Sequence, residues 1–121
     1  MLNKRFTVNI SNKIKPFKKE INVDSDKSIS IRSFLLSAIS HEVSKVENVL
    51  ESEDVHSCIR CLKKLGVKII KLEPGKYKIY GKGLGSLRAK KNTTLNCGNS
   101  GTTARLIVGL LSTNPDIQVQ I

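Results

Sequence analysis

The segment from Leu95 to Arg105 combines the residue types best suited to bind an anion through the backbone. Its sequence is LNCGNSGTTAR, and the apolar run LIVGLL follows at once. Glycine at positions 98 and 101 allows sharp backbone curvature and close approach to a ligand. The first turn of a following helix adds unpaired N–H groups and the positive end of its dipole. We therefore expect an anion-binding loop here, with a tight strand-to-helix turn capped by Ser100 or Thr102 as the alternative.

A second candidate anion site lies at the start of another expected helix, in the segment DKSISIR at residues 26–32. Ser28 and Arg32 are four residues apart, so a helix places them on one face, with Lys27 at its mouth. Lysine offers a compact charge and arginine a bidentate fork, which suits one phosphate and one carboxylate. The alternative is an N-cap serine beside two ordinary surface cations; a Walker A loop is excluded because its glycine pattern is absent. Two such helix starts in one chain predict a phosphorylated or carboxylated ligand.

Apolar periodicity indicates the elements that must position these two segments. Helices are expected at residues 27–40, 52–65 and 101–112, strands at 6–10, 20–23, 45–50, 67–72, 76–80, 93–96 and 117–121, and a further extended piece at 84–91. Ser52 is the expected N-cap of the second helix and Gly66 its C-terminal stop. A hairpin is expected around Pro74 and Gly75. The order of elements predicts an α/β (α+β) fold, with helices covering one face of a mixed sheet.

Length and composition predict one modest domain. The chain has 121 residues, 39% of them hydrophobic, and only five aromatic side chains, so the core must be mainly Ile, Leu and Val. The start of the chain has no secretory signal pattern, and the longest apolar run, residues 106–111, is far too short to cross a bilayer. We expect a cytoplasmic protein without a membrane partner.

The three cysteines are expected to be reduced structural thiols. Cys58 and Cys61 form a C-x-x-C pair, and Cys97 is distant in the sequence. Zinc needs four ligands, and no second pair exists. Metal binding or redox chemistry remains the alternative.

The net charge of +11 is unevenly distributed. Residues 60–91 contain eleven Lys or Arg and the single acid Glu73. Such a block could bind nucleic acid, but Tyr77 and Tyr80 are its only residues for base stacking and no recognised binding motif is present. We interpret the block as a solvated basic face and keep a small basic α/β nucleic-acid-binding module as the alternative function.

Both candidate anion sites resemble segments of one enzyme family. Residues 26–36 resemble the D-K-S-x-S-x-R-x-L-L-L segment of the enolpyruvylshikimate phosphate synthase (3-phosphoshikimate 1-carboxyvinyltransferase) family, and residues 95–106 resemble its L-x-C-G-N-S-G-T-T-x-R-L segment. Residues 50–55 and 65–67 are also similar to the family between these segments. The resemblance covers essentially the whole chain, in the right order and at the right spacing.

The resemblance implies transfer of the enolpyruvyl (carboxyvinyl) group from phosphoenolpyruvate to the 5-hydroxyl of shikimate 3-phosphate, with release of phosphate, in aromatic amino acid biosynthesis. It implies no cofactor and no metal. The residues that it assigns to shikimate 3-phosphate are Lys27, Ser28 and Arg32. The residues that it assigns to phosphoenolpyruvate are Lys27, Asn99, Gly101 and Thr102. Lys27, which contacts both substrates, is the one catalytic residue expected in this chain.

The resemblance also implies a larger enzyme. Family enzymes are well over three times as long and fold as two lobes of repeated βαβαββ units. Residues 1–20 would form a strand segment of the other lobe, and residues 21–121 the first unit and the start of an incomplete second one. The acidic catalytic residues would come from the missing C-terminal lobe, so we expect the chain to be inactive alone. Ser25 stands where the family usually has glycine.

Two other hypotheses compete with this one. The first is that the chain belongs to the sister transferase that acts on UDP-N-acetylglucosamine, which shares the fold but lacks the K-S-x-x-x-R element found here. The second is that the chain is a degenerate piece with no function of its own.

Lys27→Ala separates the synthase hypothesis from the nucleic-acid module. One lysine among 21 cations contributes little to non-specific polynucleotide binding, whereas the synthase hypothesis makes it central to substrate binding. We expect the variant to lose shikimate 3-phosphate binding in isothermal titration calorimetry and to keep any salt-dependent oligonucleotide binding. The opposite pattern would favour the nucleic-acid module.

Overall fold

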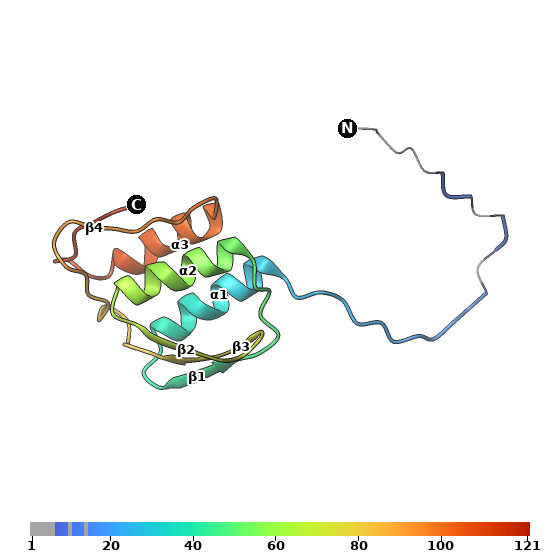
Figure 1. Cartoon of the computed structure of the whole chain (residues 1–121), viewed down its shortest axis with the longest axis horizontal. Coiled ribbons are helices and arrows are strands. Elements are labelled where there is room, and N and C mark those ends of the chain that lie inside the picture. The colour runs from blue at the N-terminus through green and yellow to red at the C-terminus, as the bar shows by residue number, and fades with distance from the viewer. Residues whose placement is uncertain (1–6, 10, 14) are drawn as a thin grey trace.

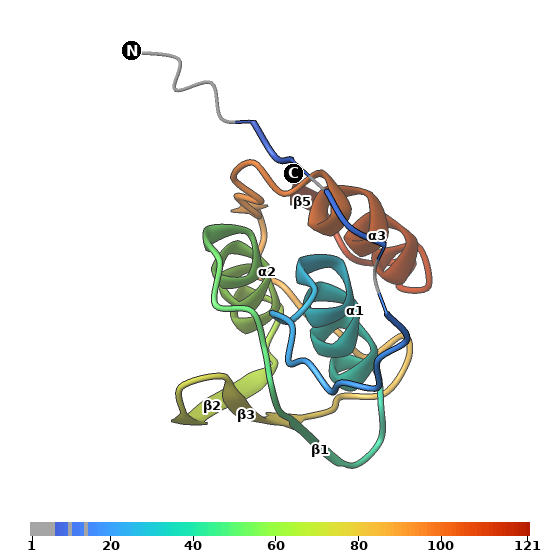
Figure 2. The ribbon, with the colours of Figure 1, turned by 90° about the vertical axis from the view of Figure 1, so that its right-hand side faces the viewer.

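The computed structural model describes residues 7–9, 11–13 and 15–121. Its helices are α1 (Lys27–Ala38), α2 (Glu53–Lys64) and α3 (Gly101–Leu111). A three-stranded antiparallel sheet has the order β1-β3-β2 and consists of β1 (Val43–Val46), β3 (Lys76–Tyr80) and β2 (Lys68–Glu73). Helices α1 and α2 pack on one face of this sheet, and α3 packs on the two helices, away from the sheet (Figures 1 and 2).

Each helix begins at a side chain that caps its first turn. Asp26 Oδ1 accepts a hydrogen bond from the Ile29 N–H at 2.7 Å at the start of α1. Ser52 and Ser100 cap α2 and α3 in the same way. The predicted caps of α2 and α3 are confirmed, whereas Asp26 rather than Ser28 caps α1. Ser28 is therefore not needed to satisfy the helix backbone.

Two glycines end elements where the sequence predicts it. Gly66 follows α2 with φ +86°, and Gly75 lies in the β2–β3 turn with φ +70°. Residues with a Cβ rarely adopt this left-handed conformation, so glycine is the natural stop at both points. The predicted hairpin is confirmed, with β2 and β3 paired from Lys68 to Tyr80.

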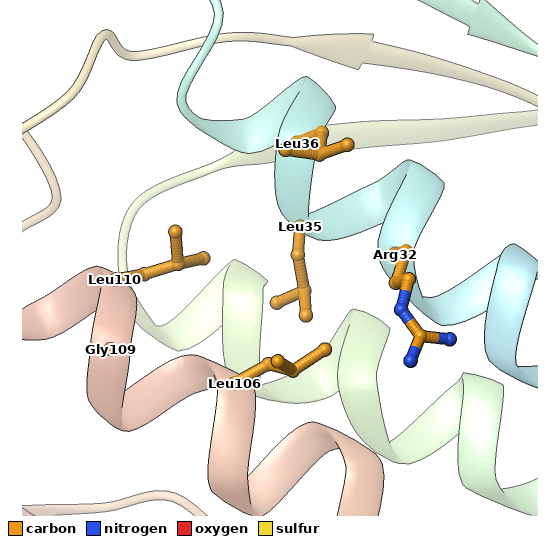
Figure 3. Close-up of a pocket in the computed structure, with 6 residues that line it drawn as sticks. All are labelled: Arg32, Leu35, Leu36, Leu106, Gly109 and Leu110. Atoms are coloured by element: carbon orange, nitrogen blue, oxygen red, sulfur yellow. The ribbon is translucent and has the colours of Figure 1, made fainter.

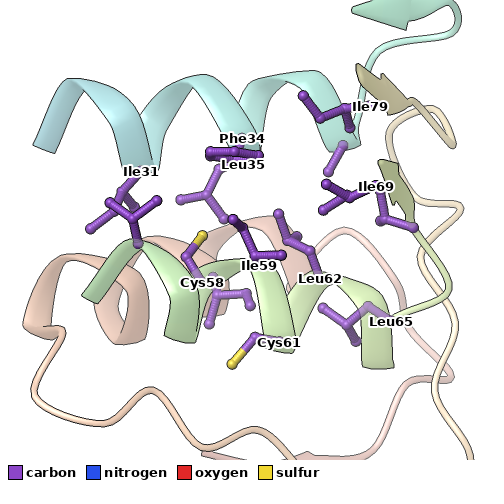
Figure 4. Close-up of a cluster of buried hydrophobic side chains, with 14 of the residues drawn as sticks. Ile31, Phe34, Leu35, Cys58, Ile59, Cys61, Leu62, Leu65, Ile69 and Ile79 are labelled. Carbon is purple, nitrogen blue, oxygen red and sulfur yellow. The ribbon is translucent and has the colours of Figure 1, made fainter. Parts of the chain in front are cut away.

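The core lies between the sheet and the helices and is mainly aliphatic, as the composition predicts. Ile31, Leu62, Leu65 and Ile79 are fully buried there (Figure 4). Each such side chain stabilises the fold by about 1.5–3 kcal/mol. Phe34 adds an edge-to-face contact with Tyr77, with ring centroids 5.1 Å apart.

Several predicted strands are wrong or shorter than expected. Residues 20–23 form no strand, and their apolar side chains Ile21 and Val23 are 71% and 76% exposed. An alternating segment becomes a strand only where a neighbouring strand accepts its hydrogen bonds, and among the described residues none lies beside it. The main sheet is therefore antiparallel rather than mixed. Residues 84–91 also lack a strand.

The other differences concern strand length and pairing. The strand expected at 45–50 is Val43–Val46, and those expected at 93–96 and 117–121 shorten to β4 (Thr93–Thr94) and β5 (Val119–Gln120). Strands β4 and β5 pair in parallel, so the partner of the final strand β5 is a strand that precedes α3 in the sequence. Part of the strand expected at 6–10 lies outside the described residues, and residues 7–9 have no regular structure.

Glu51 ties the β2–β3 hairpin to the segment before α2. Its carboxylate accepts hydrogen bonds from Lys71 Nζ, from the Tyr77 hydroxyl at 2.6 Å and from the Gly75 N–H at 3.2 Å. These bonds, led by the one from Lys71, lower the pKa of Glu51 from 4.5 to about 2. Between these values the folded chain binds fewer protons than the unfolded chain, so stability from Glu51 is present above pH 4.5 and is lost as the pH falls toward 2.

Glu51→Gln should therefore lower stability at pH 7 and flatten the fall in stability on acidification. The measurement is the urea midpoint of unfolding at pH 7 and at pH 3, for the wild type and the variant. Glu73→Gln is the control, because Glu73 pairs with Lys76 at 3.0 Å and its side chain is 63% exposed. An acid dependence in Glu51→Gln equal to that of the wild type would contradict this role.

Candidate functional site

All three helices begin at the same end of the molecule, on the right in Figure 1 and toward the viewer in Figure 2. Lys27 and Asp54 join the first turns of α1 and α2 through an ion pair of 2.7 Å. Ser57 of α2 lies against Gly98 in the loop before α3, where an added Cβ would come within 3.0 Å of the serine Oγ. Three positive dipole ends therefore gather at one end, an arrangement that favours an anion.

The start of α1 presents the predicted basic set. Lys27 has a side chain 46% exposed, Ser28 is half-buried, and Arg32 is exposed one turn further on. Within the described part of the chain, the Ser28 hydroxyl and the Arg32 guanidinium have no hydrogen-bond partner, whereas Lys27 pairs with Asp54. Arg32 stands at the edge of a groove between α1 and α3 that is otherwise apolar (Figure 3). Two of the three predicted groups are thus free to bind a ligand directly.

The loop before α3 is held in a fixed curve. Gly98 has φ +56°, and its N–H donates to Asn96 Oδ1 at 2.8 Å. The Ser100 hydroxyl is buried and donates to Thr103 Oγ1 at 2.7 Å, while also accepting the Thr103 N–H. These internal bonds use up Ser100, so it shapes the loop and is not available to a ligand.

The predicted ligand-facing residues of this loop are open to solvent. Asn99 and Gly101 are exposed and Thr102 is half-buried. A Cβ added at Gly101 would meet no other atom within 4 Å. The loop and the start of α1 lie at the same end of the molecule (Figures 1 and 2), where they are candidates for one site; α1 and α3 also contact each other directly.

Sequence reasoning missed the part of α2 in this site. Neither Asp54 nor Ser57 was among the residues expected to take part in the site. Asp54 contacts a residue 27 positions away, and Ser57 approaches a loop that follows it by some forty residues. The spacing of neighbouring residues in the sequence cannot predict either contact.

The cysteines are buried and free. Cys61 Sγ lies 4.0 Å from Cys97 Sγ, and burial raises the pKa of both Cys58 and Cys61 to about 12. Both thiols are therefore protonated at neutral pH and poorly suited to bind a metal or attack a substrate. No group of three or more His, Cys, Asp and Glu residues lies close enough to hold a metal in the described ranges.

The basic block offers little for base stacking. Tyr77 is buried, so Tyr80 is the one aromatic side chain of the block with an accessible ring. Lys68 Nζ and Lys78 Nζ lie 4.9 and 5.3 Å from the centre of that ring. Among the residues that the structure describes, no helix is long and apolar enough to span a bilayer.

The chain is thus an α/β unit whose three helices begin at one end, an arrangement typical of proteins that bind anionic ligands. Residues 11–121 match the family model of EPSP synthase (3-phosphoshikimate 1-carboxyvinyltransferase). A 3-phosphoshikimate 1-carboxyvinyltransferase of Syntrophomonas wolfei is 41% identical over 110 residues, covering 91% of this chain and 25% of the relative. One of Zymomonas mobilis is 41% identical over 106 residues, covering 88% and 23%.

Solved structures agree with the sequence relatives. The EPSP synthase from Acinetobacter baumannii matches with a TM-score of 0.69 and 38% identity, over 79% of this chain and 22% of the other. The chain belongs to the EPSP synthase family. It spans about a quarter of the length of the relatives it matches, in line with the expectation that family enzymes are more than three times as long.

Gly98→Ala should destabilise the chain by about 1–2 kcal/mol, because alanine is strained at φ +56° and its Cβ would crowd Ser57. Gly101→Ala is the matched control, since it has open space and begins a helix, where alanine is preferred. The measurement is the free energy of unfolding in urea. Equal stability of the two variants would show that the curve at Gly98 does not constrain the loop.

Proposed function

We propose that this chain forms the anion-binding part of an enzyme that transfers the enolpyruvyl group from phosphoenolpyruvate to the 5-hydroxyl of shikimate 3-phosphate and releases phosphate. Membership of the EPSP synthase family supports the reaction. The observation that carries the assignment to this end of the molecule is the convergence of the α1 and α3 starts, which bear the two family-like segments.

Shikimate 3-phosphate binds at the start of α1 in this proposal. Lys27 and Arg32 neutralise its negative charge, and Arg32 holds a phosphate or carboxylate through two parallel hydrogen bonds. The Ser28 hydroxyl adds a neutral donor. The lack of any protein partner for Ser28 and Arg32 among the described residues supports this assignment.

Phosphoenolpyruvate binds at the start of α3, against Asn99, Gly101 and Thr102. The open side of Gly101 lets an anion approach the backbone closely. Lys27 contacts both substrates and acts as the catalytic cation, because it stabilises negative charge on the reacting groups through the tetrahedral intermediate. Addition of the hydroxyl needs a base, and protonation of the enol carbon needs an acid.

In this proposal, the acidic groups for these proton transfers come from a second lobe. That lobe lies in the part of the family enzyme that this chain does not cover. Residues 1–20 contribute to that lobe, and residues 21–121 form the first unit and the start of the next. The exposed side chains of Ile21 and Val23, which have no strand beside them among the described residues, support a boundary near residue 20. The chain alone is then a half-site that binds substrate but does not turn it over.

A chimera tests the proposed function. The chain would replace the matching 110 residues of the Syntrophomonas wolfei relative, with which it is 41% identical. We expect phosphate release that requires both substrates and falls by at least a hundredfold in Lys27→Ala. Lys45→Ala, on strand β1, is the control and should keep activity. A folded chimera without activity, or one indifferent to Lys27, would contradict the proposal.

A further inference from the structure

The ion pair between Lys27 and Asp54 is the direct side-chain link between the starts of α1 and α2. Lys27 Nζ donates to Asp54 Oδ2 at 2.7 Å. The Asp54 side chain is only 17% exposed, whereas that of Lys27 is 46% exposed. The carboxylate is thus largely shielded from solvent, whereas about half of the lysine side chain stays accessible at the end of the molecule where the substrates are expected.

A carboxylate at this place is unfavourable for anion binding by charge alone. Its negative charge repels a phosphate that binds nearby. It also reduces the positive field of the three helix starts. Its benefit must therefore come from what it does to Lys27.

Order in the lysine side chain supplies that benefit. A free lysine has a flexible chain of four methylene groups, and binding a ligand restricts its rotamer freedom, which weakens affinity. A lysine already held by Asp54 has less rotamer freedom left to lose. Its ammonium group has three N–H donors, so one can stay on Asp54 while the others bind a ligand.

We propose that Asp54 is a positioning residue, which holds the Lys27 ammonium group between the starts of α1 and α2 so that it can bind shikimate 3-phosphate and phosphoenolpyruvate together. This inference rests on the proposed function of Lys27. Asp54 itself touches neither substrate in this proposal.

Glu53 offers a matched control in the same turn of α2. It carries the same charge at the same helix start, but it is 77% exposed and pairs with Arg60 at 2.6 Å instead of with Lys27. Removing either acid costs the helix a similar interaction with its dipole. A difference in ligand binding between the two variants therefore reports on Lys27.

The first experiment compares Asp54→Ala, Asp54→Asn and Glu53→Ala in the 121-residue chain by NMR titration with shikimate 3-phosphate and, separately, with inorganic phosphate. We expect Asp54→Ala to weaken shikimate 3-phosphate binding about fivefold. Asp54→Asn should recover part of the loss, because its amide oxygen still accepts from Lys27. Glu53→Ala should not weaken binding, and inorganic phosphate should bind Asp54→Ala at least as well as wild type, because it responds mainly to charge.

A double-mutant cycle shows whether Asp54 acts through Lys27. The Lys27→Ala background is titrated by NMR at millimolar shikimate 3-phosphate, where residual binding too weak for calorimetry is still measured, and there Asp54→Ala should cause no further loss. Additive losses, or binding of shikimate 3-phosphate to Asp54→Ala as tight as to wild type, would overturn the inference.

The ligand-free chain gives a second readout that does not depend on the proposed function. We expect an ordered ammonium resonance of Lys27 by ¹⁵N NMR in wild type and Glu53→Ala, and its loss in Asp54→Ala. Failure of wild type to bind shikimate 3-phosphate would count against the proposed function. An ammonium resonance equal in wild type and Asp54→Ala would overturn the inference on Asp54, whatever the ligand does.

Discussion

The packing of α2 is the constraint on which the rest of the structure depends. Its side chains Val55, Cys58, Ile59 and Leu62 are buried, and the helix contacts α1, α3 and strand β2. Because α2 packs on α1 and α3, and α1 and α3 also contact each other, the starts of α1 and α3 are fixed relative to each other. The candidate anion site depends on this packing, since the starts of α1 and α3 are far apart in the sequence.

The same helix controls the detail of the site. Asp54 pairs with Lys27 at the start of α1, and Ser57 lies against Gly98 in the loop before α3. Ser57 in turn receives a hydrogen bond from Arg60 at 2.8 Å, one turn further along. The packing of the core fixes the position of α2. The position of α2 in turn places the side chains that contact the candidate ligand-binding groups.

Features encoded by neighbouring residues could be predicted from the sequence. Ser52 and Ser100 cap helices, and Gly66 ends one, because these roles depend on the local backbone. The two candidate anion-binding segments could also be identified locally, since each carries its own glycines, hydroxyls or cations; that they bind an anion stays a prediction. Features that depend on a distant partner were not predictable. Residues 20–23 alternate like a strand but lie exposed, because no strand lies beside them among the described residues.

The contact between Lys27 and Asp54 shows the same limit in the site itself. Each residue has an ordinary local role, as a cation at a helix mouth and an acid in a first helical turn. Only the packing of α1 on α2 makes them a pair. The candidate binding residues could be named from the sequence, whereas Asp54, the residue that pairs with one of them, became visible only in the fold.

The central claim is that the starts of α1 and α3 form one anion site. Its most direct test is a map of backbone amide shifts in the 121-residue chain during addition of shikimate 3-phosphate and then phosphoenolpyruvate. We predict saturable shifts at residues 26–32 with the first substrate and further shifts at 98–103 with the second. Shifts spread over the lysine-rich hairpin at 68–78, with neither helix start affected, would contradict the claim.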